Sequence, residues 1–179
     1  TSTVTEPTAL TLSGSVTNVD CKGNSTGSVT LTAGGGTSPY TYKNGTGSYQ
    51  ASATFSTLAA GSYTFTVKDA NGCTQTVTST VTEPTALTLS GSVTNVDCKG
   101  NSTGSVTLTA GGGTSPYTYK NGTGSYQTSA TFSTLAAGSY TFTVKDANGC
   151  TQTVTSTVTE PTALTLSGSV TNVDCKGNS

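Results

Sequence analysis

Apolar and polar residues alternate along much of this chain, and the alternation predicts strands. Tyr63, Phe65 and Val67 alternate with serine, threonine and lysine, which is the period of a strand with one buried face. The sequence Asp-Ala-Asn-Gly follows at 69–72, and asparagine and glycine both tolerate the positive φ angles of tight turns. A cysteine, Cys73, ends this turn, and a second alternating stretch rich in threonine begins after it. We therefore predict a core β-hairpin with a cysteine at its tip.

The same alternation predicts further short strands in the residues around this hairpin. Polar or glycine-rich stretches separate them, and Pro84 ends the last one because proline cannot donate to a strand ladder. Six or seven short strands with frequent turns are typical of an immunoglobulin-like β-sandwich, so the predicted fold class is all-β. The predicted strands lie around Leu10–Val16, Val29–Ala33, Pro39–Tyr42, Tyr49–Phe55 (one or two strands), the strand of Tyr63 and Val67, and Val77–Val81.

This set of strands is repeated along the chain. The sequence Thr-Glu-Pro at 5–7 returns at 82–84 and 159–161, so the repeat has a period of 84 − 7 = 77. The two whole copies differ only at Ala51, which corresponds to Thr128. A period of this length suits a small β-sandwich, and the chain is expected to be a window of a longer array. We divide it into the end of a preceding repeat (1–6), two tandem β-sandwich repeats with this period (7–83 and 84–160) and the start of a following repeat (161–179).

The composition narrows the classes of partner. The 179 residues carry a formal net charge of −1, with only 8% charged residues and no basic cluster. A protein of this kind is not expected to bind nucleic acid or an anionic membrane surface. No apolar run approaches the ~20 residues that a membrane-spanning helix needs. The many threonine and valine residues have high β propensity and favour an ordered chain.

The residue types needed for catalysis or metal binding are scarce. There is no histidine, and no two cysteines lie close together in the sequence, so the usual zinc motifs are absent. One period of the sequence holds three carboxylates, Glu83, Asp97 and Asp146, which are far apart and give no sign of a catalytic pair. The turn at 69–72 lacks the further acidic ligands of an EF-hand loop. We therefore expect no enzyme activity and no catalytic, cofactor-binding or metal-binding residues.

The cysteines are spaced alternately, by 73 − 21 = 52 and then by 98 − 73 = 25, which suggests disulfides. Pairing Cys21 with Cys73 and Cys98 with Cys150 keeps each bridge within a unit, leaves Cys175 for a residue outside the window and stabilises a unit by about 4 kcal/mol in the chain-entropy model. Pairing Cys73 with Cys98 would instead link neighbouring units. A seven-strand up-and-down order places Cys21 and Cys73 at opposite poles, whereas a six-strand order places them together. Either pairing implies an oxidising, extracellular environment.

Three motifs occur in order within one repeat. They are Cys21-x-Gly23 followed by Gly27-Ser28-Val29, then Gly35-Gly36-x-x-Pro39-Tyr40-x-Tyr42, then Leu58-x-x-Gly61-x-Tyr63-x-Phe65-x-Val67-x-Asp69-x-x-Gly72-Cys73. Taken together, these motifs resemble the SprB-type repeat, which occurs in very large surface adhesins of gliding bacteria of the Bacteroidetes group. The resemblance implies a non-catalytic unit of a secreted filament, exported by the type IX pathway, that supports gliding motility, surface attachment or capture of other cells.

The nearly verbatim repetition favours a structural or adhesive role, because an array gains length with each unit and its weak contacts gain avidity. We expect a repeat segment of a long extracellular filament or adhesin on the cell surface, with other copies of the same chain and surface glycans as its partners. The alternative is a carbohydrate-binding module array of a secreted protein. A secreted enzyme with its catalytic domain outside this window is the third reading. Aromatic residues exposed on one sheet would favour carbohydrate binding, and the candidates for such surface contact are Tyr40, Tyr42, Tyr49, Tyr117, Tyr119 and Tyr126.

Overall fold

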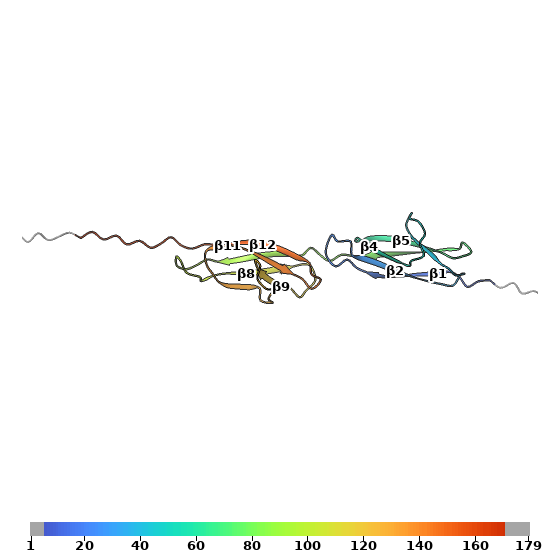
Figure 1. Cartoon of the computed structure of the whole chain (residues 1–179), viewed down its shortest axis with the longest axis horizontal. Helices are drawn as coiled ribbons and strands as arrows, with labels where there is room; N and C mark the ends of the chain where they lie inside the picture. The colour runs from blue at the N-terminus through green and yellow to red at the C-terminus, as the bar shows by residue number, and fades with distance from the viewer. Residues whose placement is uncertain (1–5, 171–179) are drawn as a thin grey trace, which may run out of the picture.

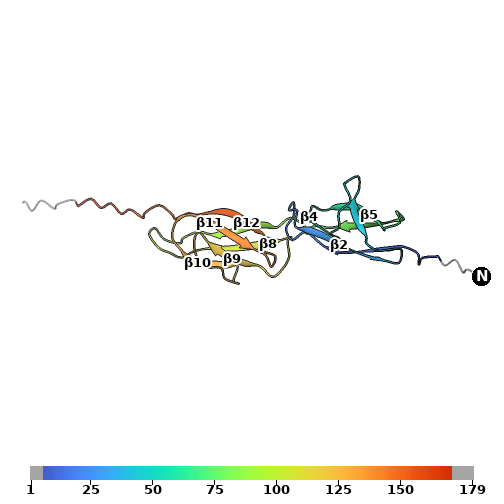
Figure 2. The same ribbon diagram turned by 45° about the vertical axis from the view of Figure 1, so that its right-hand side comes forward.

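The computed structural model describes residues 6–170 of the chain. Within that range there are twelve strands and no helix, and the strands form two units that lie end to end along the long axis of the molecule (Figures 1 and 2). None of the described residues belongs to a helix that could cross a membrane. Cys175 and its expected bridge lie outside the described residues.

Each unit contains six strands in the same order, and both copies have the same strand lengths. In the first unit the strands are β1 (Thr11–Thr17), β2 (Gly27–Gly34), β3 (Thr41–Asn44), β4 (Thr54–Leu58), β5 (Gly61–Lys68) and β6 (Thr74–Val81). In the second unit they are β7 (Thr88–Thr94), β8 (Gly104–Gly111), β9 (Thr118–Asn121), β10 (Thr131–Leu135), β11 (Gly138–Lys145) and β12 (Thr151–Val158).

The six strands of a unit form two antiparallel sheets. In the first unit the strand orders are β1-β2-β4 and β3-β5-β6, and the second unit repeats them as β7-β8-β10 and β9-β11-β12. The core lies between the two sheets, where Val29 of one sheet and Phe65 and Val67 of the other are completely buried. The counterparts in the second unit, Val106, Phe142 and Val144, are buried to the same degree. The prediction of tandem immunoglobulin-like β-sandwich repeats is confirmed.

The predicted core hairpin is formed by β5 and β6, which pair from Gly61 with Val81 to Lys68 with Thr74. Its alternation works as expected, because the threonines between the buried apolar residues point away from the core. The hydroxyl of Tyr63 donates a hydrogen bond of 3.0 Å to the carbonyl oxygen of Ala59. This bond ties β5 back to the short connection from β4, much as a tyrosine corner does in immunoglobulin-like domains.

The chain between β3 and β4 decides where the cysteines lie. Residues 45–53 turn back beside β3, where Gln50 forms a single antiparallel bridge with Tyr42. This segment runs antiparallel to β3, as a further strand would, but it forms only this one bridge. The unit therefore has six strands, while its chain crosses from pole to pole as often as in a seven-strand up-and-down fold.

As a result, Cys21 and Cys73 lie at opposite ends of the first unit. The backbone N–H of Val19, just after β1, donates to the carbonyl oxygen of Thr82, just after β6, at 3.0 Å. The ends of β1 and β6 therefore meet at one pole, while β6 begins at the other pole, directly after Cys73. We call the first end the loop pole, since it carries the loop 18–26, and the second end the tip pole, since it carries the hairpin tip 69–73. The second unit has the same poles at 95–103 and 146–150.

Candidate functional site

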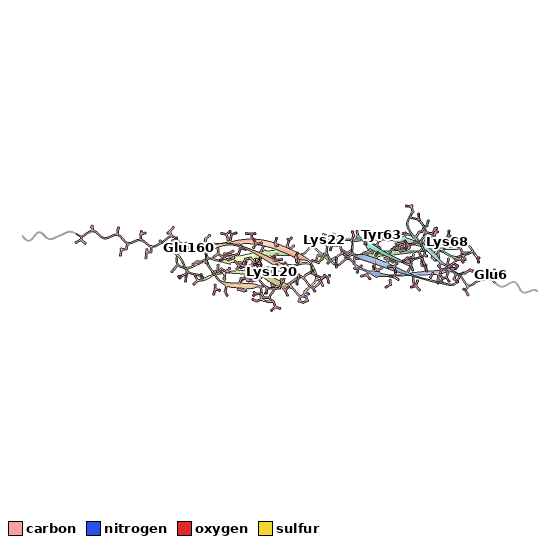
Figure 3. All side chains as sticks on the ribbon, in the orientation of Figure 1. Glu6, Lys22, Tyr63, Lys68, Lys120 and Glu160 are labelled. Atoms are coloured by element: carbon pink, nitrogen blue, oxygen red, sulfur yellow. A yellow bond between two sulfur atoms is a disulfide. The ribbon has the colours of Figure 1, made fainter. Side chains whose placement is uncertain are left out.

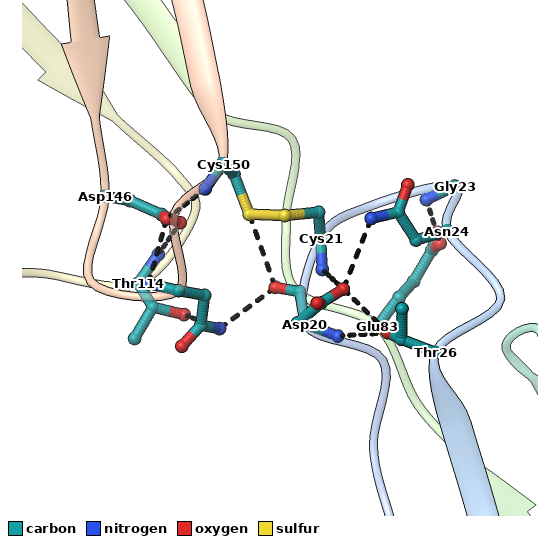
Figure 4. Close-up of a disulfide and its surroundings, with 10 residues drawn as sticks. Asp20, Cys21, Gly23, Asn24, Thr26, Glu83, Thr114, Asp146 and Cys150 are labelled. Carbon is teal, nitrogen blue, oxygen red and sulfur yellow. Dashed lines mark hydrogen bonds between the residues drawn. A yellow bond between two sulfur atoms is a disulfide. The ribbon is translucent and has the colours of Figure 1, made fainter.

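A disulfide crosses the junction between the two units. It joins Cys21 on the loop pole of the first unit to Cys150 on the tip pole of the second, with their Cα atoms 5.7 Å apart (Figure 4). Cys73 and Cys98, the other two cysteines in the described part of the chain, are exposed and free.

Both predicted pairings are therefore wrong. The bridges Cys21–Cys73 and Cys98–Cys150 would have to span a whole unit from pole to pole, because the segment 45–53 restores the seven-strand order. The alternative bridge between Cys73 and Cys98 is not formed either, since these cysteines lie at the poles that face away from the junction. The observed bridge does link neighbouring units, but it uses Cys21 of the first unit and Cys150 of the second.

The loop that carries Cys21 is held by the side chain of the residue before it. The carboxylate of Asp20 accepts hydrogen bonds from the backbone N–H of Cys21 at 2.6 Å, the amide of Asn24 at 3.2 Å and the hydroxyl of Thr26 at 2.6 Å (Figure 4). These bonds, first the one from Thr26 and then the one from Asn24, hold the pKa of Asp20 below its ordinary value. The carboxylate thus fixes the loop in a single conformation.

A second carboxylate ties the same loop to the chain that leaves the unit. Glu83 lies just after β6, and its two oxygens accept from the Lys22 ammonium at 2.6 Å and the Gly23 backbone N–H at 2.8 Å. Lys22 is labelled at the end of the first unit that faces the second (Figure 3). The Lys22 and Gly23 bonds keep the pKa of Glu83 low. The loop pole is therefore anchored to the start of the linker.

The tip that carries Cys150 is organised around a buried aspartate. One oxygen of Asp146 accepts from the backbone N–H groups of Asn148 at 3.0 Å and Cys150 at 2.8 Å. The other accepts from the backbone N–H of Thr114 at 2.9 Å. Only 4% of Asp146 is exposed, so its carboxylate holds the turn in shape from inside through these hydrogen bonds. Gly149, at φ 88°, supplies the left-handed backbone that the turn requires.

Polar contacts accompany the disulfide across the junction. The side-chain amide of Asn148 donates to the backbone carbonyl oxygen of Asp20 at 2.9 Å and to the hydroxyl of Thr114 at 3.1 Å. The Sγ atom of Cys150 lies 3.5 Å from the same carbonyl oxygen of Asp20. A disulfide sulfur carries no proton, so this second approach is a packing contact. The junction therefore joins a backbone carbonyl of one unit to a side-chain amide of the next.

The linker between the units is attached to both of them. On the side of the first unit, Thr82 accepts from Val19 and donates its N–H to the side-chain oxygen of Asn18 at 2.9 Å. On the side of the second unit, the carbonyl oxygen of Thr85 accepts from the Gly113 N–H at 2.9 Å. Only Glu83 and Pro84 lie between these attachments. A connection this short, together with the disulfide, gives the two units little freedom to bend.

A cleft of about 450 Å³ lies at the junction. Its lining comes from the loop pole of the first unit, from the linker and from the tip pole of the second unit. No group of three or more histidine, cysteine, aspartate or glutamate residues in the described range is placed to hold a metal ion. The chemistry seen at this junction is a disulfide cross-link between units. The lining residues are Cys21, Lys22, Asn24, Ala86, Leu87, Gly149, Cys150 and Thr151.

The tyrosines proposed for surface contact do not form a shared platform. Tyr42 is only 7% exposed and packs in the core, because it lies opposite Val67 on the inner face of its sheet. The surface assignment of Tyr42, and of its counterpart Tyr119, is wrong. Tyr40 is half-buried and donates its hydroxyl to the carbonyl oxygen of Gly35 at 2.5 Å. Tyr117 repeats this arrangement in the second unit.

Tyr49 is half-buried, and lysines cover its ring. The ammonium groups of Lys68 and Lys43 lie 4.3 and 5.1 Å from the ring centroid, which are cation–π distances. Tyr126 has the same arrangement with Lys145 and Lys120. A sugar ring stacking on this tyrosine would have to displace a lysine.

Sequence reasoning missed the residues that build the junction. Glu83 and Asp146 stand out in the sequence only as scattered carboxylates, and Asp20 and Asn148 belong to no motif identified there. The available signal was that an aspartate lies immediately before Cys21 and four residues before Cys150. Side-chain oxygens of aspartate commonly bond to backbone N–H groups just after them. Both cysteines therefore lie in loops that their own neighbours hold in place.

Comparison with known proteins gives a family-model match to two segments and several distant structural similarities. No curated protein gave a significant match. The C-terminal 282-residue fragment of intimin, solved with the intimin-binding domain of its translocated receptor, is 16% identical, with 84% of this chain and 64% of that chain covered and a TM-score of 0.44. Domains 1–6 of the surface layer protein SbsC are 21% identical, with 89% and 29% covered and a TM-score of 0.36. Fibronectin(III)-like modules of Clostridium thermocellum CbhA are 15% identical, with 85% and 95% covered and a TM-score of 0.35.

These structural similarities are too remote to support a statement about function. The family comparison is more informative, because the SprB repeat matches residues 13–47 in the first unit and residues 90–127 in the second. Each match runs from the first strand of its unit through the cysteine loop to the turn after the third strand. The two matched segments are consistent with the SprB-type repeat that the motifs predicted.

Proposed function

We propose that this chain is a load-bearing segment of a long extracellular bacterial surface filament or adhesin, in which stiff repeats hold a binding partner away from the cell. The observation that carries the proposal is the disulfide between Cys21 and Cys150. A bridge within a unit would stabilise that unit alone. A bridge between units resists their separation, which is the requirement of a stalk under tension.

Two further features support the proposal. SprB-type repeats occur here in tandem, and the only sequence difference between the two whole units is Ala51 against Thr128. A disulfide is expected to persist in an oxidising compartment such as the cell exterior. The resemblance to filament proteins of gliding Bacteroidetes extends the proposal to surface attachment during gliding and to export by the type IX pathway.

The carbohydrate-binding alternative has less support from the described residues. Flat aromatic rings open to solvent on one sheet are needed to stack on sugars, and here Tyr42 is buried while Tyr49 is covered by two lysines. In the array that we propose, adhesion is a property of other parts of the protein or of many weak contacts along its length.

Stretching single molecules tests the load-bearing role. If the chain is pulled from its two ends with the bridge intact, only the segments 7–21 and 150–160 of the two units can lengthen, which is ~80 Å at ~3.5 Å per residue. In the reduced chain each unit can release its whole length, ~270 Å before the folded length is subtracted. We expect short extensions in the oxidised chain and two long steps after reduction.

The double variant Cys21→Ser/Cys150→Ser is the matched control, and it should give the two long steps with or without reductant. Two long steps from the oxidised native chain would show that the bridge does not carry the load, and the stalk proposal would then fail.

A further inference from the structure

We propose that the two outer poles of this pair of units are docking sites for further copies of the same repeat, each closed by a disulfide of the Cys21–Cys150 type. The sites are the tip pole of the first unit, with Cys73, and the loop pole of the second, with Cys98. The inference rests on the proposed function and names its partner, which is another copy of the repeat.

The free tip pole already has the conformation of the bonded one. Asp69 accepts from the backbone N–H groups of Thr37 at 3.0 Å, Asn71 at 3.0 Å and Cys73 at 2.8 Å. The corresponding distances around Asp146 at the bonded tip are 2.9, 3.0 and 2.8 Å. The tip that carries the free thiol therefore needs no rearrangement to form the junction.

The free loop pole also matches its bonded counterpart. The carboxylate of Asp97 accepts from the backbone N–H of Cys98 at 2.7 Å and from the hydroxyl of Thr103 at 2.7 Å, against 2.6 Å for both bonds of Asp20. Glu160 binds Lys99 at 3.0 Å and the Gly100 N–H at 2.8 Å, as Glu83 binds its own loop. Both halves of a junction are thus preformed at the outer ends.

The hollows at the outer poles are lined by counterparts of residues that line the junction cleft. At the tip pole of the first unit a hollow of about 240 Å³ is lined by Ala9, Leu10 and Cys73 among others, the counterparts of Ala86, Leu87 and Cys150. At the loop pole of the second unit a hollow of about 470 Å³ includes Cys98 and Lys99, the counterparts of Cys21 and Lys22. Each end therefore presents the surface that the other kind of end covers in the middle of the molecule.

One further contact points to the same partner. The side-chain amide of Asn71 donates to the hydroxyl of Thr37 at 3.0 Å, whereas its counterpart Asn148 also donates across the junction to Asp20. A further copy of the repeat would supply the acceptor that Asn71 lacks.

The covalent step is an ordinary thiol oxidation. The thiol of Cys98 and the thiol of the Cys150 counterpart in the next copy lose two protons and two electrons and form one S–S bond. The electrons pass by thiol–disulfide exchange to a disulfide oxidant, which is reduced to two thiols.

This pattern of bridges makes the array interlaced. The two cysteines of a bridge are separated by 129 in sequence, whereas the repeat has a period of 84 − 7 = 77. Because the bridged loop is longer than the repeat, each bridged loop overlaps the next one along the chain. Every peptide bond inside a long array is then bypassed by at least one bridge. A single backbone cut leaves the filament in one piece.

The same interlacing limits how far the array can stretch. Along the array, the shortest covalent path alternates between a bridge and a stretch of backbone. Each stretch runs from a tip cysteine to the following loop cysteine, as from Cys73 to Cys98. One bridge and one such stretch together span two units. Fully extended, that path is ~90 Å. Two folded units already contain two eight-residue strands end to end, ~54 Å, before their loops and linkers are counted. Unfolding would therefore add little length while the bridges hold.

The test uses the chain lengthened by one copy of residues 84–160, inserted before residue 161. All cysteines are changed to serine except Cys98 and the counterpart of Cys150 in the third copy. After oxidation with a cyclic disulfide oxidant, we expect both thiols of the monomer to be protected from alkylation, as measured by mass spectrometry of the denatured, unreduced protein. Two matched variants retain only Cys73 and Cys98, or only Cys98 and Cys150, and should leave both thiols open to alkylation.

A third variant of the lengthened chain retains only Cys21 and Cys150, and its bridge shows that the units are folded. If this bridge forms but the one from Cys98 does not, the docking inference is overturned while the load-bearing proposal stands. If neither bridge forms, both fail. Bridge formation by Cys98 with the nearer Cys73 or Cys150 would also overturn the inference.

Discussion

The two hairpin tips have the same sequence, Asp-Ala-Asn-Gly-Cys, but different surroundings. The tip at 146–150 is bonded to the first unit, while the tip at 69–73 faces no other unit in the described part of the chain. Their internal hydrogen bonds are nevertheless nearly equal, at 3.0, 3.0 and 2.8 Å in the free tip and 2.9, 3.0 and 2.8 Å in the bonded one. The differences are the disulfide itself and the bond from Asn148 to Asp20. The junction is therefore made from parts that fold locally, and the bridge fastens them without reshaping them.

This comparison predicts unequal effects for two cysteines with the same local structure. Replacing Cys21 by serine removes the bridge and the constraint on the long loop that it closes. We expect the oxidised chain to lose about 5 kcal/mol of unfolding free energy, following the chain-entropy model for long loops. Replacing its counterpart Cys98, which is free and exposed, should change the unfolding free energy by no more than ~0.5 kcal/mol. Denaturant unfolding under oxidising conditions measures both values.

Reductant supplies the control, because it should make the three proteins equal. Equal losses in C21S and C98S under oxidising conditions would contradict the comparison, since they would mean that the serine itself disturbs the loop.

The contrast between core and junction also explains how much the sequence could predict. The strands and the core of each unit follow from an alternation that is set locally, and Phe65 and Val67 are buried as expected. The bridge was predicted wrongly because it depends on which pole each cysteine occupies. That in turn depends on residues 45–53, which return along β3 but form only the bridge from Gln50 to Tyr42. A segment of this kind runs in the direction of a strand but lacks the alternation of apolar and polar residues from which strands are predicted.

The polar residues of the junction were harder to identify for a similar reason. Asp146 stabilises its loop through backbone N–H groups, and such bonds need no particular residue type at the donor positions. The partners of Asp146 therefore leave no signature in the sequence. The tyrosine prediction failed at Tyr42 because β3 has only four residues, too few for a clear alternation to show which face is buried.

The carboxylates of the poles predict the response to acid. Hydrogen bonds from Thr26 to Asp20, from the Thr37 N–H to Asp69 and from Lys22 to Glu83 lower the pKa of each group in the folded chain. A lowered folded pKa means that the unfolded chain takes up the proton more readily. The stability from these bonds is present above the ordinary values of 3.8 and 4.5 and is lost as the pH falls through the lower folded values.

We therefore expect the denaturant midpoint to stay level between about pH 8 and pH 5, since the chain has no histidine, and to fall below about pH 4. Asp69→Asn should reduce the steepness of that fall. Glu6→Gln, at an exposed counterpart of Glu83, is the control and should leave it unchanged. A fall centred near neutral pH would show that other groups govern the response.

The smallest expected effect isolates the one hydrogen bond by which the tips differ. The amide of Asn148 donates to both Thr114 and the carbonyl oxygen of Asp20, whereas Asn71 donates only to Thr37. Neither asparagine needs a positive φ, so alanine fits both backbones. Asn148→Ala and Asn71→Ala lose the same bond within the tip, but only the first loses the bond across the junction.

A bond of this kind is worth about 0.5–1.5 kcal/mol, which corresponds to about a two- to tenfold change in an equilibrium constant. In buffers of oxidised and reduced dithiothreitol, the Cys21–Cys150 bridge should therefore be about two- to tenfold easier to reduce in N148A than in the native chain, and unchanged in N71A. Equal shifts in the two variants would place the effect inside the tip, and the difference between the tips would then rest on the disulfide alone.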